Sequence, residues 1–513
     1  MAKVKFNIKE LLDENIKERY DKLFNEKSTL LTRARDCALL TLPSVLPIDG
    51  HKENDVLATP YQSLGARLVN NLASKLIMTL IPPNNSFFRL FPTMEVKAQL
   101  DESIQQEADN IAVMAEKEAQ KVIEKQSIRV SAFELFKSLI VTGNALGVKT
   151  EDGLKTYRYD QYVVMRDYKG NVLEIITTET VDPDTLDPAI VEQLDLTPDA
   201  DCIVYTRAVL REKTWYEYQY INDLLVEGSD ASYKPEKFPY MPLRWTSING
   251  HNYGIGLVEQ YIGDFRSLEA CYQMLIEHAA VAGKTVFGIK PGSVLDVDSL
   301  ASADNGDVIQ GDFENDLTVM RVDKGADIQY IQQVAEVLQR RLEQAFLSAS
   351  SVARDSERTT AKEISYMAAD LEQSLGGVYS VQSQEFQAPL ARLVLNEIKV
   401  DFGTFEFIVV TGVDALGRNT DLERLMQFTQ VLQATGLQEA LAARMNIDNL
   451  INDLTNASGL PTGRYVKSEQ QVQQEQQAAQ QNQLMQQGGQ ALAESAGAGM
   501  GQQLTGAPQG ASK

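Results

Sequence analysis

The fragment Gly283-Lys284-Thr285 is the part of this 513-residue chain that most resembles a catalytic motif. A phosphate-binding loop reads GxxxxGKS or GxxxxGKT and follows a β-strand, because its backbone amides must surround the phosphates. In this chain His278 occupies the position of the first glycine, and the residues before it have the apolar spacing of a helix. The fragment therefore predicts a helix C-cap at Gly283 rather than a nucleotide site.

Residue spacing supports neither metal nor nucleophile chemistry. The three histidines, His51, His251 and His278, share no ligand spacing with a cysteine or an acidic residue. The sequence also contains no GxSxG nucleophile elbow. We therefore expect no catalytic site, no metal and no cofactor. A nucleic-acid-processing enzyme with an unrecognised active site is the alternative from the enzyme class.

One polar loop, residues 350–360, carries side chains that could contact phosphate. Guanidinium, ammonium and hydroxyl groups suit phosphate contacts that hold a nucleic acid without reading its sequence. From residue chemistry alone, a solvated loop with a threonine N-cap ahead of Glu363 explains the same pattern. The candidate contacts are Ser350, Ser351, Arg354, Arg358, Thr359 and Lys362.

The elements before this loop predict a projecting stalk. Apolar residues in steps of three and four run from Val258 to Ala282, which predicts a helix whose seam packs on another helix. An insert from Thr285 to Asp327 with short β-like runs separates it from a second helix over Tyr330–Ala349. Two helices that leave a body and return indicate assembly rather than turnover. A coiled-coil scaffold unrelated to DNA is a further alternative.

The sequence on either side of the stalk predicts an α+β, predominantly helical protein of several domains. Residues 1–145 have the apolar periodicity of helices, and residues 146–245 alternate Val, Ile, Thr and Tyr as an antiparallel sheet does. After the loop, residues 361–414 predict a helix kinked at Pro389 and then a strand. Residues 415–467 predict further helix, and residues 468–513 are rich in Gln and Gly.

Composition narrows the class of partner. The net charge of −23 argues against a static grip on DNA, because such surfaces are basic, but it suits a channel in which DNA slides. The three cysteines form no CxxC pair, which favours a reducing compartment. The N-terminus has no apolar signal segment, and the apolar run 68–82 is too short to cross a bilayer, so we expect no membrane partner.

Several short stretches together carry a family resemblance. The longest runs from Phe346-Leu347 through Arg354-Asp355-Ser356-Glu357-Arg358-Thr359-Thr360-Ala361-Lys362-Glu363-Ile364, and Leu371-Glu372-Gln373-Ser374-Leu375-Gly376-Gly377-Val378-Tyr379-Ser380 follows. Shorter pieces are Gln384-Glu385, Pro389-Leu390, Thr142-Gly143-Asn144-Ala145, Arg244-Trp245 and Tyr253-Gly254. Through them the chain, over about Glu10 to Pro461, resembles the head-to-tail connecting (portal) proteins of short-tailed, podovirus-type phages.

The resemblance implies a portal-type fold assembled as a ring of twelve subunits at one capsid vertex. It implies a conduit for genome packaging and ejection, with double-stranded DNA passing through the channel. The implied parts are a wing (1–252), two stem helices (253–284 and 328–349), a clip (285–327), a tunnel loop facing DNA (350–360), a wing helix and strand (361–414), a crown (415–467), and a barrel remnant or disordered tail (468–513).

The resemblance also implies the partners and their place. These are terminase during packaging, a tail adaptor, capsid proteins and internal core proteins, with the ring in the virion and its subunits in the host cytoplasm during assembly. The ATP chemistry would reside in the terminase, so the chain itself would be no enzyme. The implied clip contacts with terminase and adaptor are Thr285, Phe287, Lys290, Asp307, Phe313 and Arg321.

Overall fold

The computed structural model divides the chain into two compact units. One contains residues 1–99 and 115–416, and the other contains residues 100–114 and 417–513. The residues that the structure describes are 15–52, 54–83, 86–92, 102–194, 202–282, 286–320, 325–348, 370, 373–375, 377–398 and 407–411. Apart from residues 102–114, the described residues belong to the first unit.

Helices form the N-terminal part of this unit, as the apolar periodicity predicts. They are α2 (Ile16–Glu26), α3 (Ser28–Leu39), α4 (Leu64–Leu80), α6 (Glu102–Lys125, of which the first residues belong to the second unit) and α7 (Ile128–Thr142). The Asn15 side chain caps α2 by accepting a hydrogen bond from the Glu18 amide at 3.0 Å. The face of α2 that carries Ile16, Tyr20 and Leu23 is buried against the adjacent sheet.

The predicted antiparallel sheet is confirmed, but it is two sheets rather than one. The larger joins β4 (Tyr162–Arg166), β5 (Val172–Val181), β6 (Cys202–Arg211), β7 (Thr214–Ile221) and β8 (Leu224–Leu225), with β9 (Ala231–Tyr233) also paired to β7. The smaller has the order β10 (Tyr240–Arg244), β2 (Asn144–Lys149) and β3 (Leu154–Tyr157). Two-residue turns at Glu212-Lys213 and Asn222-Asp223, with positive φ at both residues, join the strands that flank them.

Short elements complete this region. They are the 3₁₀ turns Tyr159–Gln161, Pro183–Thr185 and Pro235–Lys237 and the helix α8 (Pro188–Leu194).

A third strand pair joins distant parts of the chain. Strand β1 (Phe88–Pro92) pairs antiparallel with β13 (Phe407–Thr411) in a two-stranded sheet. The expectation that residues 1–145 are helical is wrong at β1 and at the start of β2. Strand β1 pairs with a strand far away in sequence, and β2 lies between the distant β10 and the nearby β3. Both strands are short, so local periodicity carries little signal for them.

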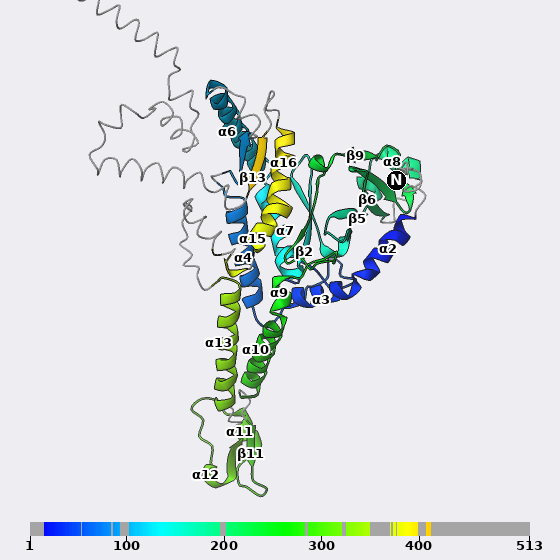
Figure 1. Cartoon of the computed structure of the whole chain (residues 1–513). Helices are drawn as coiled ribbons and strands as arrows, with labels where there is room; N and C mark the ends of the chain where they lie inside the picture. The colour runs from blue at the N-terminus through cyan, green and yellow to red at the C-terminus, as the bar shows by residue number, and fades with distance from the viewer. Residues whose placement is uncertain are drawn as a thin grey trace, which may run out of the picture. The chain divides into compact units, whose positions relative to one another are not determined.

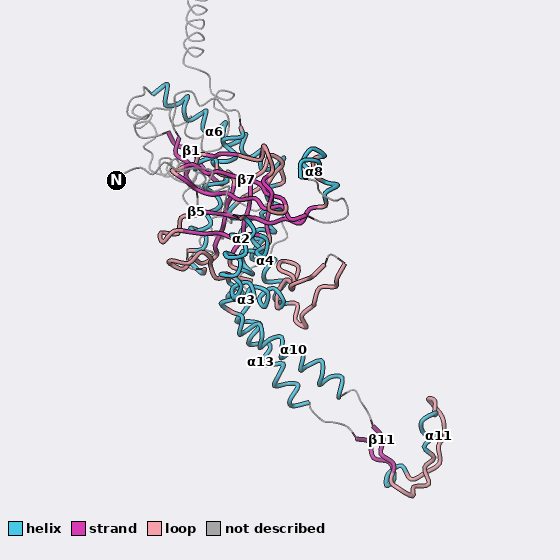
Figure 2. Tube along the Cα trace, turned by 90° about the vertical axis from the view of Figure 1, so that its right-hand side faces the viewer, coloured by secondary structure: helices cyan, strands magenta, loops and turns pink. Residues whose placement is uncertain are grey.

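Two long helices, α10 (Ile262–Ala282) and α13 (Gly325–Ala345), form the stalk that the sequence predicts. They lie side by side and extend from the body of this unit in both views (Figures 1 and 2). Between them come β11 (Val286–Ile289), α11 (Val297–Ser302), α12 (Phe313–Asp316) and β12 (Leu317–Met320), with β11 and β12 antiparallel. The short helices α11 and α12 had no counterpart among the predicted elements.

The first stalk helix starts later than predicted. The resemblance implies one stem helix from Tyr253, whereas the structure has a short α9 (Leu257–Gln260) and a break at Tyr261 before α10. Close packing before α9 explains the difference, because a Cβ atom on Gly256 would lie 2.7 Å from the backbone nitrogen of Gly143. Gly143 itself ends α7 with φ of +78°. The chain therefore crosses the end of α7 in extended form before it becomes helical.

The last helix that the structure describes contains a π-helical turn. It consists of α15 (Val378–Gln382), the π turn Ser383–Gln387 and α16 (Ala388–Glu397). Pro389 lies in the first turn of α16, where its missing N–H costs little, so the irregularity falls just before the proline. Side chains at the π turn bond to other elements: Gln387 donates to the Leu80 carbonyl at 2.8 Å, and Glu385 accepts from Arg244 at 2.7 Å.

Candidate functional site

The stalk and its tip form the candidate site, since the sequence predicts assembly there. All six loop residues named above, from Ser350 to Lys362, lie outside the described part of the chain. Thr285 and Arg321 lie outside it as well. Their roles stay predictions. The remaining four tip residues, Phe287, Lys290, Asp307 and Phe313, are described and exposed.

The tip, residues 286–320, is held together by its own polar contacts. The Asp296 carboxylate accepts a hydrogen bond from the Ser299 hydroxyl, and it caps α11 by accepting from the amides of Asp298 and Ser299. The hydroxyl bond first, and the amide bonds after it, lower the pKa of Asp296. The Lys290 amide donates to the Asp316 carbonyl at 3.1 Å, and the Ser293 hydroxyl donates to the Asp316 carboxylate at 3.0 Å. These bonds fix the segment between the two strands.

The tip exposes apolar side chains within an acidic surface. Residues 286–320 contain seven acidic residues and a single lysine, Lys290. Exposed apolar patches that are surrounded by polar residues often mark protein interaction sites. The exposed apolar residues are Phe287, Val294, Val297, Val308 and Phe313.

The stalk helices pack on each other near the body. Phe265 and Leu268 of α10 are buried, as are Leu342 of α13 and Phe346 just beyond it. The rings of Phe265 and Phe346 meet edge to face, with centroids 5.7 Å apart. This confirms the first part of the seam that the spacing of three and four predicts, whereas Ala279, farther along the same predicted seam, is exposed.

Farther along, the same two helices expose apolar residues that no other described part of this unit covers. On α13 these residues recur at i, i+4 and i+7, and Tyr330 is 70% exposed and Val337 48% exposed. On α10, Met274 and Val281 lie on one side, and Ile276 lies about 160° around the helix from Met274. The full set is Met274, Ile276, Val281, Tyr330, Val334 and Val337, and we call these residues the stem surface.

Charged side chains fasten the base of the stalk to the body. The Glu269 carboxylate of α10 accepts from the amides of Tyr61 and Gln62 at 2.8 and 3.2 Å. Arg266 donates to Asp36 at 2.9 Å. Across the stalk itself, Arg341 of α13 pairs with Asp264 of α10 at 3.2 Å. The base is therefore held by the body, whereas the stem surface is not.

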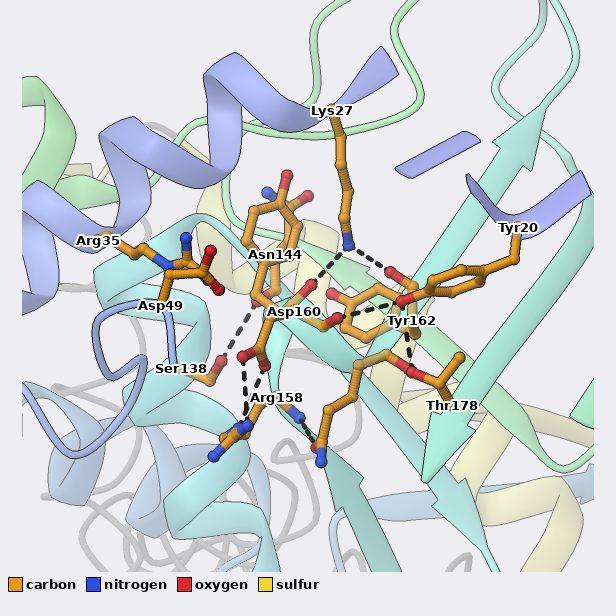
Figure 3. A network of polar contacts seen from close by, with 12 residues as sticks. Tyr20, Lys27, Arg35, Asp49, Ser138, Asn144, Arg158, Asp160, Tyr162 and Thr178 are labelled. Carbon is orange, nitrogen blue, oxygen red and sulfur yellow. Dashed lines mark hydrogen bonds and ion pairs between the residues drawn. The ribbon is translucent and has the colours of Figure 1, made fainter. Parts of the chain in front are cut away.

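A buried lysine, Lys27, joins the N-terminal helices to the large sheet (Figure 3). Its Nζ donates to the carbonyl oxygens of Tyr159 and Tyr162. It also lies 4.6 Å from the ring centroid of Tyr159 and 5.7 Å from that of Tyr253, distances typical of cation–π contacts. Burial lowers the pKa of Lys27 to about 7, and the charge of Asp160 opposes that shift. In sequence Lys27 looks like an ordinary solvated charge.

A second buried charge cluster lies in the same sheet. The Glu174 carboxylate, 1% exposed, pairs with Arg207 at 2.7 Å and with Arg19 of α2 at 2.5 Å. Such a cluster ties α2 to β5 and β6 and gives no reacting group. Among the described residues no group of His, Cys, Asp and Glu could hold a metal ion, and no helix is long and apolar enough to cross a membrane.

Comparison with known proteins places this chain in a protein family. Residues 13–466 match the family model described as bacteriophage head to tail connecting protein. The portal protein of Escherichia phage T7 is 33% identical over 526 residues, covering 97% of this chain and 96% of that protein. The portal protein of Enterobacteria phage T3 is 32% identical over 517 residues, with the same two coverages.

A solved structure, the neck of an empty GTA particle, matches 76% of this chain and 89% of its own at 12% identity and a TM-score of 0.35. That similarity is too low to support an argument. The family match is different in kind, because it spans the helices, the sheets and the whole stalk. The chain therefore belongs to the family of bacteriophage head to tail connecting proteins.

Proposed function

We propose that the chain is the subunit of a portal: a ring of identical copies at one capsid vertex, through which the genome is packaged and ejected. The observation that carries this proposal is the family match over residues 13–466, whose relatives from phages T7 and T3 are named portal proteins. The chain acts in this role as a structural conduit, with no catalytic centre of its own.

The stem surface supports the ring. A subunit in a closed ring has two neighbours, so it must offer contacts on two sides. Met274 and Val281 lie on one side of α10 and Ile276 on another, while Tyr330, Val334 and Val337 form a stripe on α13. In the assembled ring of twelve, copies of α10 and α13 cover these residues and form the stem.

The other parts of the chain follow the family arrangement. Residues 285–327 form the clip, and the helices and sheets before α9 form the wing together with α15, α16 and β13. Residues 350–360 form a tunnel loop, residues 415–467 a crown, and residues 468–513 a variable tail. Capsid proteins and internal core proteins contact the ring from the head side.

The charge of the chain suits a conduit. A net charge of −23, repeated in every subunit, repels DNA from most of the ring, so the duplex does not adhere to the wall. Arg354, Arg358 and Lys362, with the hydroxyls of Ser350, Ser351 and Thr359, supply a narrow basic collar that touches phosphates. A weak collar in an acidic channel contacts DNA without trapping it.

The clip binds the partners outside the head. Its exposed apolar side chains and acidic residues suit a partner face with apolar sockets and basic side chains. Terminase uses this face during packaging and supplies the ATP chemistry, and the tail adaptor replaces it afterwards. Thr285, Phe287, Lys290, Asp307, Phe313 and Arg321 are the proposed contacts.

Two experiments test the proposal. Electron microscopy of the purified full-length chain should show rings with a central opening, and a compact monomer at all concentrations would reject the ring. Phage carrying Arg354→Ala with Arg358→Ala should lose packaged DNA or eject it abnormally. Wild-type genome retention and ejection in that phage would reject the basic collar.

A further inference from the structure

Helix α4 reaches the end of α13 through two cationic side chains. Arg67 donates to the Glu343 carboxylate at 2.6 Å, so it binds the side of the last helical turn. Lys75, two turns farther along α4, donates from Nζ to the backbone carbonyl of Leu347. The two contacts differ in kind, because Arg67 binds a side chain, whereas Lys75 binds the backbone where the helix has ended.

Leu347 terminates α13 in a conformation that leucine rarely adopts. Its φ is +57°, the left-handed region that glycine normally occupies at this position. The Leu347 amide donates to the Gln344 carbonyl at 3.1 Å, and the Ser348 amide donates to the Glu343 carbonyl at 2.7 Å. These two bonds define a Schellman C-cap with leucine in the glycine position. A strained terminus persists only where surrounding groups hold it.

Lys75 supplies such a hold. An ammonium group beside the last carbonyls of a helix is favoured by the helix dipole as well as by the hydrogen bond itself. The side chain is half-buried, and burial lowers the pKa of Lys75. The carboxylate of Asp370 opposes that lowering, so the ammonium also lies in the field of Asp370. The Ser374 hydroxyl bonds to the Asp370 carboxylate at 3.2 Å and helps to orient it.

Leu347 and Asp370 flank the stretch 349–369, which contains the residues of the basic collar. We propose that Lys75 is a positioning residue for that stretch: it fixes the backbone where the chain leaves α13 and attracts the carboxylate where the chain returns. The part of this inference that concerns DNA rests on the proposed function. The part that concerns anchoring does not, because it depends only on Lys75, Leu347 and Asp370.

Hydrogen exchange tests the anchoring directly. In the assembled full-length protein, Lys75→Met should speed exchange in peptides covering residues 342–350 by about fivefold to tenfold, because the amides of Leu347 and Ser348 lose their support. Lys75→Arg keeps a cationic donor and should restore the slow rate. Arg67→Met, which removes the neighbouring contact with Glu343, should leave these amides slow. Slow exchange in Lys75→Met would overturn the proposal. Exchange in Lys75→Arg and Arg67→Met as fast as in Lys75→Met would also overturn it.

Genome retention then separates this proposal from the proposed function. Phage with Lys75→Met should lose packaged DNA as the Arg354→Ala, Arg358→Ala double variant does, whereas phage with Arg67→Met should retain it. If Lys75→Met speeds exchange but only the double variant loses packaged DNA, the positioning role of Lys75 is wrong and the basic collar stands. If Lys75→Met speeds exchange but both Lys75→Met and the double variant keep their packaged DNA, the basic collar is wrong. The role of Lys75 in DNA contact is then wrong as well.

Discussion

A single charge on the stem surface should prevent assembly without unfolding the subunit. Val337 is the last residue of the apolar stripe on α13, and 48% of it is exposed in the single subunit. We expect Val337→Asp to leave the monomer folded, because the position faces water and a charge on an exposed helical face costs little. In the proposed ring a neighbouring copy covers the same position, so the introduced carboxylate would lose its water.

The size of the effect follows from two terms. Covering the exposed half of a valine contributes about 0.7 kcal/mol, half of the low end of the range for a buried aliphatic side chain. Dehydrating a carboxylate without a partner costs several kcal/mol more. Arg341, one turn away, already binds Asp264 and gives little relief. A total of about 3 kcal/mol per interface corresponds to affinity lowered roughly a hundredfold.

Native mass spectrometry across a concentration series measures this directly. Wild type should give a closed ring, and Val337→Asp should give monomers at concentrations where wild type is fully assembled. Val130→Asp is the matched control, because it places the same charge on the exposed face of α7, outside the stalk. Rings of Val337→Asp at wild-type concentration, or equal loss of rings in the control, would refute the assignment of the stem surface.

Three further predictions concern the body. Glu174→Gln should lower the free energy of unfolding by about 3 kcal/mol in urea titrations, because two arginines bind this buried carboxylate. Glu179 on the same strand is more exposed, at 28%, so Glu179→Gln should cost under about 1 kcal/mol. The pKa of Lys27 is lowered, so the folded state binds fewer protons than the unfolded state above pH 7. The free energy of unfolding should therefore rise by about 1 kcal/mol per pH unit from pH 7.5 to 8.5. Lys27→Met should abolish that slope. Gly143→Ala should lower the thermal midpoint far more than Gly250→Ala, since both have positive φ but only a Cβ on Gly143 meets backbone, at 2.2 Å from the Gly256 nitrogen.

Each of these three predictions would be contradicted by a specific result. Equal losses in Glu174→Gln and Glu179→Gln would mean that burial does not set the strength of the pair. Parallel pH profiles for wild type and Lys27→Met would mean that the aromatic rings and carbonyls keep Lys27 charged in spite of its burial. Equal thermal midpoints for the two glycine variants would show that the α7 terminus can move away from α9.

Elements with a repeated pattern could be predicted from the sequence, and elements that depend on distant residues could not. The seam of α10 and α13 repeats over several turns, and the strands β4 to β7 alternate Val, Ile, Thr and Tyr, so each signal is local and strong. Strand β1 is five residues long, and its partner β13 follows only at Phe407. Nothing near β1 in the sequence indicates that pairing.

The candidate site was predictable to a similar degree. Exposed Phe287 and Phe313 belong to an insert that the sequence marks as separate, although their contact with a partner stays a prediction. Lys27 and Lys75 could not be identified in the same way. A lysine between helical residues indicates a solvated face, and only the folded arrangement shows that one is enclosed by tyrosines and the other holds a helix terminus.

The most direct test of the central claim is an asymmetric cryo-electron microscopy reconstruction of the tail vertex in genome-filled heads. The account predicts a closed ring of this chain at one vertex, with α10 and α13 of neighbouring copies in contact and DNA density along the ring axis. A vertex that lacks this chain, or a ring without a continuous channel for DNA, would contradict it.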